Sequence, residues 1–250
     1  MKLLSLNVEQ SKHLSLVLPF LQKEEADVVA LAEVCEGDIP KLSGTSYPYS
    51  LFAPNFRFRE EEGGAICGAA ILSKYPLTLV EKMYCGRGSE TDIPLHGMGT
   101  HAPVVLLADV NVPGDVYRVG AVHFTWTPDG QPTPEQRADV ATLLARLADK
   151  GEMVLAGDFN IPRGKNELYA ELAGRFTDNI PKSVTSSIDP HLHRVNVASP
   201  GELSLMVDYV WTTPEYTARD VQVTCGVSDH CGVVATISRT GMPTRGRSEP

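Results

Sequence analysis

The feature that most constrains this chain is a set of short apolar runs, each of which stops abruptly at a polar residue. Runs of this length, rich in Val, Leu and Ala, are typical of buried β-strands. The polar residues that close or adjoin these runs are Asn7, Glu33, His123, Asp158, Asp208, Asp229 and His230. Because catalytic groups commonly lie where strands end in loops, we expect these side chains to gather in one site.

Strands dominate the predicted secondary structure. The chain begins with a strand at 2–8, a helix at 14–25 and a strand at 27–32. Further strands are predicted at 49–53, 68–73, 77–84, 104–112, 116–124, 153–156, 207–212, 221–225 and 232–237. The Pro113-Gly114-Asp115 turn should join two of them as a hairpin.

Two later helices are predicted, and one has clear end signals. Thr133 is its expected N-cap, Pro134 lies in its first turn, Gln136 would complete a capping box, and Gly151 would stop it. The second is expected at 165–172.

Runs that are apolar on both faces, such as 28–31, predict strands covered on both sides. Many such strands with few helices favour two packed mixed sheets flanked by helices, a four-layer α/β/β/α sandwich of the α/β class. We expect one domain over residues 1–239. Residues 240–250, rich in Gly, Pro, Arg and Ser, are expected to form a flexible tail.

Net charge and cysteine usage restrict partners and compartment. With 22 basic and 31 acidic residues the net charge is −9, so a general basic surface for nucleic acid is absent, and an anionic substrate must be met by a local site or by metal ions. Five cysteines without a Cys-x-x-Cys pair predict free thiols in a reducing compartment. The short apolar N-terminus is unlike a signal peptide, and no run approaches a membrane span of about 18 residues. A cytoplasmic protein is therefore expected.

The polar residues belong to motifs whose order is informative. In chain order these are Asn7, the 27–32 run closed by Glu33, the segment 70–76, His123, Gly157-Asp158-Phe159-Asn160, the segment 207–210 and Ser228-Asp229-His230. The set resembles the endonuclease/exonuclease/phosphatase superfamily, which includes DNase I, sphingomyelinases, inositol-polyphosphate 5-phosphatases and deadenylases. A lone Gly-Asp-x-Asn could be a simple turn, whereas the ordered set is specific. The resemblance implies a DNase I-like fold with residues 1–239 as the catalytic domain.

Phosphoester hydrolysis needs a hard divalent cation, a positioned water and donors around the phosphoryl group. The resemblance assigns Glu33 as a carboxylate ligand of Mg²⁺ or Mn²⁺. Asn7 would be a neutral oxygen ligand or an orienting group, and Asp229 a further carboxylate near the same ion. One or two ions are possible. Taken alone, Glu33 would more simply be interpreted as a surface carboxylate at a strand end.

The remaining residues would act on water and phosphate. Asp158 is expected to activate the water or to bind a second ion, and Asn160 to hold the nucleophile or a phosphate oxygen. The resemblance pairs Asp208 with His230, so that the charged ring donates to a phosphate oxygen. His123 would approach the phosphate from the other side as donor or acid, with an orienting partner that the sequence does not identify.

Other histidines and aromatic residues are interpreted more simply. His96, His101, His191 and His193 lie in predicted loops, where loop or substrate-rim roles are favoured. The aromatic residues Phe124, Trp126 and Trp211 are expected to pack rather than to stack on a base.

Three functions follow from these motifs. The first is a metal-dependent phosphodiesterase or nuclease acting on a phosphoester, with DNA and RNA as candidate substrates. The second is a phosphomonoesterase for a small-molecule, inositol or lipid phosphate, favoured by the −9 charge and the lack of a Lys/Arg run. The third, a non-catalytic scaffold, is disfavoured by the complete set of reacting groups. The segment Asn7-Val8-Glu9-Gln10 differs from the sequence usual in the abasic-site branch, which argues against abasic-site repair. The motifs imply no protein partner.

Overall fold

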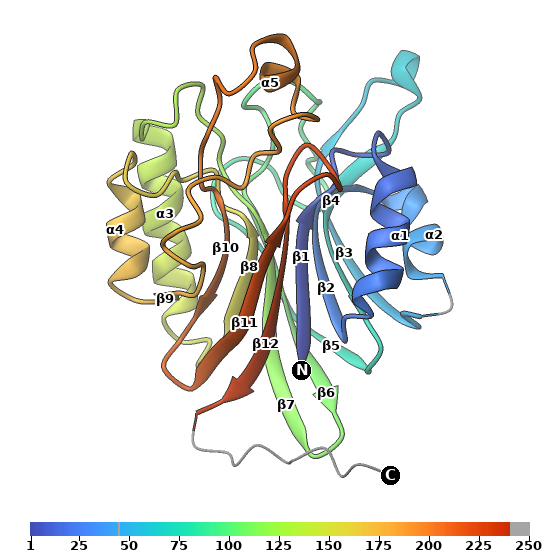
Figure 1. Cartoon of the computed structure of the whole chain (residues 1–250), viewed down its shortest axis with the longest axis vertical. Coiled ribbons are helices and arrows are strands. Elements are labelled where there is room, and N and C mark those ends of the chain that lie inside the picture. The colour runs from blue at the N-terminus through green and yellow to red at the C-terminus, as the bar shows by residue number, and fades with distance from the viewer. Residues whose placement is uncertain (45, 241–250) are drawn as a thin grey trace.

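Two six-stranded sheets pack face to face at the centre of the molecule (Figure 1). The computed structural model describes residues 1–44 and 46–240. The strand orders are β11-β12-β1-β2-β4-β3 and β5-β6-β7-β8-β10-β9. Both sheets are mixed, because β1 pairs in parallel with β2 and antiparallel with β12, while β7 pairs in parallel with β8 and antiparallel with β6.

The strands of each sheet come from both halves of the chain. The first sheet contains β1 (Lys2–Asn7), β2 (Val28–Cys35), β3 (Tyr49–Arg57), β4 (Ile66–Ser73), β11 (Tyr216–Thr224) and β12 (Gly232–Arg239). The second sheet contains β5 (Leu77–Tyr84), β6 (Val104–Val112), β7 (Asp115–His123), β8 (Val154–Asp158), β9 (Thr177–Asp178) and β10 (Asp208–Thr212). The α-helices are α1 (Leu14–Glu24), α2 (Ile39–Ser43), α3 (Pro134–Leu147), α4 (Leu168–Ala173) and α5 (Arg194–Ala198). Short 3₁₀ helices are η1 (Glu36–Asp38) and η2 (Glu60–Glu62).

Helices cover the outer face of each sheet: α1 and α2 lie on the first and α3 and α4 on the second (Figure 1). Successive side chains of β1 point to opposite faces of the sheet, which shows how the layers form. Leu4 and Leu6 pack in the cluster that contains Phe20 of α1, whereas Leu3 packs in the cluster between the sheets. β1 is therefore buried on both faces, which explains its continuous apolar run. The predicted four-layer α/β/β/α sandwich is confirmed.

The predicted strands are observed, with differences at their ends. The 113–115 turn joins β6 and β7 as a hairpin, with Val112 opposite Asp115. β3 continues past its predicted end at Ala53 through a register shift to Arg57. β11 and α4 begin at Tyr216 and Leu168 rather than at the predicted residues 221 and 165. The sequence does not predict the short elements α2, β9 and α5, because segments of 5, 2 and 5 residues are too short to show a periodic hydrophobic pattern.

The predicted capping box of α3 is only half present. The Thr133 hydroxyl accepts from the backbone N–H of Gln136 at 3.1 Å, as expected. The Gln136 side chain does not return to Thr133. It is fully buried and donates to the backbone carbonyls of Thr125 at 2.7 Å and Asn160 at 3.1 Å, and the helix ends at Leu147, before Gly151.

The prediction of free thiols is wrong for four of the five cysteines. Disulfides join Cys35 to Cys67 and Cys225 to Cys231, and only Cys85 is free. Cys35 and Cys67 face each other because β2 and β4 pair in a register that no local pattern reveals. Disulfides persist in oxidising compartments, so the argument for a reducing compartment, and with it for a cytoplasmic location, loses its support.

Among the residues that the structure describes, no helix has the length and hydrophobicity required to cross a membrane. The predicted tail, apart from Thr240, lies outside the described residues. The Thr240 backbone N–H donates to the Glu215 carbonyl at 2.7 Å. The domain boundary at 239 stays a prediction.

Candidate active site

Strand ends from both sheets bring the predicted polar residues to one end of the sandwich. In the second sheet, Asp158 lies opposite His123 on β7 and opposite Asp208 on β10. In the first sheet, Asn7 ends β1 opposite Ala32, the residue before Glu33. β1 runs upward from the N-terminus in Figure 1, so the cluster lies at the end of the molecule where α5 lies.

Asn7 links the two sheets. Its side-chain Nδ2 donates to Glu33 Oε1 and to Asp158 Oδ2, both at 3.2 Å, while its Oδ1 accepts from the backbone N–H of Glu9 at 3.1 Å. The residue is almost fully buried. The sequence allows Asn7 to be a metal ligand or an orienting group. Because its side-chain oxygen already accepts from the backbone, the geometry favours the orienting role.

Glu33 lies at a bulge between β2 and β4, where the pairing register shifts. Its φ of 54° is left-handed, which is uncommon for a residue with a side chain and turns the carboxylate toward the site. Gln10 Nε2 holds Oε2 at 2.6 Å. Burial alone would raise the pKa of Glu33, but His123, His101 and the Asn7 hydrogen bond together lower it.

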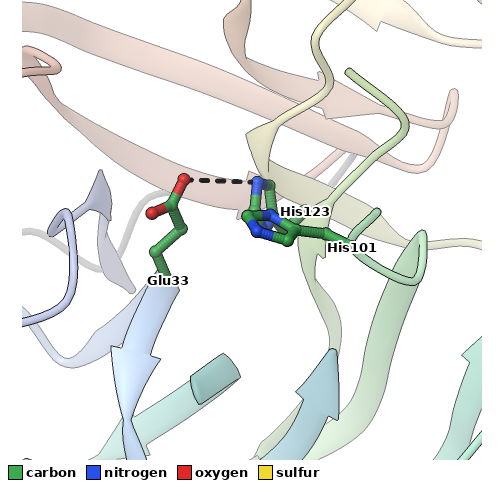
Figure 2. Close-up of side chains that lie close together, drawn as sticks. All are labelled: Glu33, His101 and His123. Carbon is green, nitrogen blue, oxygen red and sulfur yellow. Dashed lines mark ion pairs between the residues drawn. The ribbon is translucent and has the colours of Figure 1, made fainter. Parts of the chain in front are cut away.

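Two histidines face Glu33, as Figure 2 shows. His123 Nε2 lies 3.6 Å from Glu33 Oε1, and one ligand atom each from Glu33, His101 and His123 lie within 4.8 Å of one another. The side-chain amide of Asn55 contacts His123 Nδ1 at 2.7 Å. Asn55 is the orienting partner that the sequence did not identify, because β3 was predicted to stop two residues before it.

His101 was interpreted as a loop or rim residue, and the structure places it beside Glu33 instead. Its ring stacks on Phe56 with centroids 4.0 Å apart, and its Nε2 lies 3.0 Å from His96 Nδ1. Burial and the neighbouring His123 lower the pKa of His101 to about 3. No local signal could have found this residue, because it follows an irregular loop rather than an apolar run.

The Gly157-Asp158-Phe159-Asn160 segment spans the end of β8 and the first two residues after it. Gly157 has a φ of 146°, and a Cβ there would lie 2.1 Å from the Val122 carbonyl oxygen, so only glycine fits. Asp158 Oδ1 accepts from the Asn160 backbone N–H at 2.9 Å, and Asn160 Nδ2 donates to the Phe124 carbonyl at 3.1 Å. Burial and the nearby Asp208 raise the pKa of Asp158 to about 6.

The structure brings Asp208 and His230 together. His230 Nδ1 lies 2.7 Å from Asp208 Oδ2, and its Nε2 faces Asp158 Oδ2 at 3.9 Å. Burial would lower the pKa of His230, but Asp208 and Asp158 raise it well above its usual value, so the ring is charged. The other Asp208 oxygen, Oδ1, is buried without a hydrogen-bond partner among the described residues.

Asp229 lies on the outer side of this cluster. Its carboxylate groups with Glu9 and His13, whose ligand atoms lie within 4.8 Å of it, rather than directly with Glu33 and His123. Burial, with Glu9 and Glu33 nearby, raises the pKa of Asp229 to about 6.

The remaining candidates differ in exposure. Phe124 and Trp211 are buried, as expected, whereas Trp126 is 36% exposed. His191 is exposed, and the His193 ring lies 6.4 Å from that of His230.

The donor set fits a divalent cation. Four carboxylates, those of Glu33, Asp158, Asp208 and Asp229, gather at one end of the core, and no Lys or Arg among residues 1–44 and 46–240 forms a hydrogen bond or ion pair with any of them. Buried carboxylates need positive charge or hydrogen bonds, and oxygen-rich sites suit Mg²⁺ and Mn²⁺. The unpartnered Asp208 Oδ1 shows that internal hydrogen bonds do not satisfy the whole group.

Comparisons with solved structures agree with this fold. An endonuclease/exonuclease/phosphatase family protein from Leptotrichia buccalis superposes with a TM-score of 0.70 at 18% identity, covering 95% of this chain and 99% of that one. The human Nocturnin catalytic domain gives 0.66 at 17% identity, covering 96% and 93%. A mannosyl-6-phosphatase from Bacteroides thetaiotaomicron gives 0.66 at 13%, covering 95% and 99%. These likenesses show the fold.

No curated protein matches the chain by sequence. The sequence model of the Endonuclease/Exonuclease/phosphatase family matches residues 4–230, a span that begins in β1 and ends at His230. The resemblance seen in the ordered motifs is thereby confirmed. The chain belongs to the endonuclease/exonuclease/phosphatase family, whose members are phosphoester hydrolases.

Proposed function

We propose that this protein is a divalent-metal-dependent phosphodiesterase or nuclease that cleaves its substrate by in-line attack of water. One observation carries the proposal: the buried carboxylates of Asp158 and Asp208 converge on the charged His230 at the end of the sandwich, the half-buried Glu33 lies beside His123, and no Lys or Arg among the described residues is bound to these carboxylates. Such a site can bind a cation and a phosphate side by side.

Glu33 is the proposed metal ligand. Its carboxylate is held by Asn7 and Gln10 and has a lowered pKa, so it is ionised and oriented before an ion binds. A bound divalent cation would neutralise phosphate charge and favour attack by water. Asp229, on the outer side, is the proposed additional carboxylate near that ion.

Asp158 is the proposed water activator. Its oxygens are fixed by the Asn7 side chain and by the Asn160 backbone N–H, so the carboxylate presents one orientation to the site. Asn160 donates its side-chain N–H to Phe124, which leaves the amide oxygen to accept from the attacking water.

His230 is the proposed phosphate donor. Asp208 holds Nδ1, keeps the ring charged and points Nε2 toward Asp158. An N–H from a charged ring stabilises the negative charge that develops on a non-bridging oxygen.

A phosphomonoesterase on the same scaffold is the second candidate. The net charge of −9 and the absence of Lys and Arg contacts to the described site carboxylates favour a small phosphate over a long polyanion. One of the proteins of similar fold is named a mannosyl-6-phosphatase, which agrees with this candidate.

Turnover of a substrate panel tests the proposal. Plasmid DNA, RNA, bis-p-nitrophenyl phosphate, p-nitrophenyl phosphate and inositol phosphates are each assayed with Mg²⁺, Mn²⁺ and excess chelator. We expect diester hydrolysis that requires the cation and that Glu33→Gln abolishes, while Glu36→Gln, an exposed neighbour, leaves it unchanged. A monoester-only profile would establish the second candidate, and activity in excess chelator would refute the metal role.

A further inference from the structure

We propose that Glu33, His101 and His123 form one binding site for a nitrogen-preferring divalent ion, such as Zn²⁺ or Co²⁺. This deepens the proposed function, on which it rests for the metal role of Glu33. It changes the identity of the favoured ion and gives His101 a role for which the sequence offered no signal.

The three side chains converge from three separate segments. Glu33 comes from the bulge of β2, His123 from the end of β7 and His101 from the loop before β6, and in Figure 2 both rings lie across from the carboxylate. The 3.6 Å between His123 Nε2 and Glu33 Oε1 is too long for a good hydrogen bond. It is close to the separation of two ligands that share one ion, since metal–ligand bonds to N and O are about 2.0–2.2 Å long.

Each imidazole has a hydrogen-bonding partner at one of its two nitrogens. Asn55 contacts His123 at Nδ1, and His96 contacts His101 at Nε2. Metal-ligating histidines almost always have such an outer partner, which fixes the ring and its tautomer. Asn55 is fully buried and its Oδ1 has no partner among the described residues, so a half-turn of the amide lets Oδ1 accept from Nδ1–H. That arrangement leaves a lone pair on Nε2 facing Glu33.

Packing also holds the rings in place before an ion arrives. His101 stacks on the fully buried Phe56, and the edge of its ring meets His123 with centroids 5.6 Å apart. Ligands whose rotamers are fixed by packing lose little conformational freedom on binding an ion.

The ligand types decide which ion is preferred. Mg²⁺ takes oxygen ligands and keeps several waters, whereas imidazole suits Zn²⁺, Co²⁺ and their neighbours. Two imidazoles beside one carboxylate therefore favour a transition ion over Mg²⁺. In this site His123 binds the ion, and His230 is the histidine that donates a hydrogen bond to the phosphate.

Cobalt binding tests the site without any turnover. Tag-free full-length protein is stripped with chelator and titrated with Co²⁺, and the visible d–d bands report ligation. We expect saturable bands that Zn²⁺ abolishes by displacing Co²⁺ and that a large excess of Mg²⁺ does not. His101→Phe, which keeps the stack on Phe56, should weaken Co²⁺ binding at least about 10- to 100-fold, as loss of even an outer partner does. His191→Ala, at an exposed histidine, should leave binding unchanged.

The outcomes separate this inference from the proposed function. Unchanged Co²⁺ affinity in folded His101→Phe, or in His101→Gln should the first variant not fold, would overturn the inference, even if Mg²⁺-dependent hydrolysis persists. Displacement of Co²⁺ by equimolar Mg²⁺ would also overturn it. If Co²⁺ binds through His101 but no phosphoester is hydrolysed, the proposed function fails and the metal site stands.

Discussion

At the scale of single residues, His230 is contacted by a carboxylate at each of its ring nitrogens. It is buried between two carboxylates, with Asp208 at 2.7 Å from Nδ1 and Asp158 at 3.9 Å from Nε2. One ring nitrogen is therefore committed to orientation and the other is free to meet a ligand. In the proposed mechanism, Asp208 is therefore a positioning residue for His230.

Asp208 and His230 should behave as one unit in a double-mutant cycle. We expect His230→Ala and Asp208→Ala each to reduce kcat/KM severely, and the double substitution to be little worse than the more severe single one. Once the imidazole is gone, the carboxylate has nothing to orient. The measurement is kcat/KM of all four proteins with the same substrate and ion.

Folding controls complete this experiment. Each variant must keep a cooperative thermal transition near that of the parent protein. A double substitution whose loss equals the product of the two single losses would show that the residues act independently.

At the scale of secondary structure, α3 contributes to the site although none of its residues was a candidate. The fully buried Gln136 donates to the carbonyls of Thr125 and Asn160 and accepts from Asn166 Nδ2 at 2.9 Å. The helix thus holds the loops that follow β7 and β8, the strands that end at His123 and Asp158.

Gln136→Met should loosen that support. The variant keeps the length of the side chain but leaves the two carbonyls and the Asn166 amide without this partner, and each buried group left unpaired costs about 1–3 kcal/mol of folding free energy. We also expect a fall in kcat at 25 °C of about tenfold or more, because the Asn160 loop loses one of the hydrogen bonds that hold it in position. Denaturant unfolding and steady-state kinetics measure the two effects.

Arg137→Ala on the same helix is the matched control, since its exposed ion pair with Glu167 should contribute at most about 1 kcal/mol. Stability lost without any change in kcat would mean that Gln136 supports only the fold.

At the scale of the whole molecule, the sandwich concentrates negative charge at one end. Burial raises the pKa of both Asp158 and Asp229 to about 6. A carboxyl whose pKa is higher in the folded state binds its proton more tightly there than in the unfolded chain, where Asp has a pKa of about 3.9. The free energy of unfolding therefore falls as pH rises from about 4 to about 6, and it stays lower above that range.

Asp229→Asn should accordingly stabilise the metal-free protein at pH 7, by about 1–3 kcal/mol, with no difference from the parent protein near pH 4. Mn²⁺ should reduce or reverse the difference at pH 7, because a cation offsets the buried charge in the parent protein. Thermal unfolding in chelator and in Mn²⁺, at both pH values, gives these comparisons.

Asp149→Asn, at a carboxylate that is 81% exposed, should show neither effect. Equal stability of Asp229→Asn and the parent protein at pH 7 in chelator would show that the ionised Asp229 carboxylate does not destabilise the metal-free protein.

Local pattern alone determined the strands and the polar residues that end them. A run such as 28–31 predicts a strand wherever it lies. The motifs that contain Glu33, Asp158 and His230 are each one short, continuous segment of the sequence. The fold class, the family and the placement of these residues at strand ends could therefore be predicted. The physical reason is that hydrophobic periodicity and turn chemistry act over a few neighbouring residues.

Only the tertiary structure decided which distant side chains meet. Asn55 reaches His123 because β3 runs past a register shift, His101 reaches Glu33 through an irregular loop, and Cys35 faces Cys67 because β2 and β4 pair in one register. Gln136 looked like a capping residue, yet its side chain supports the Asn160 loop. Each of these contacts depends on the packing of segments far apart in the chain, and the energy of that packing has no counterpart in any local sequence pattern.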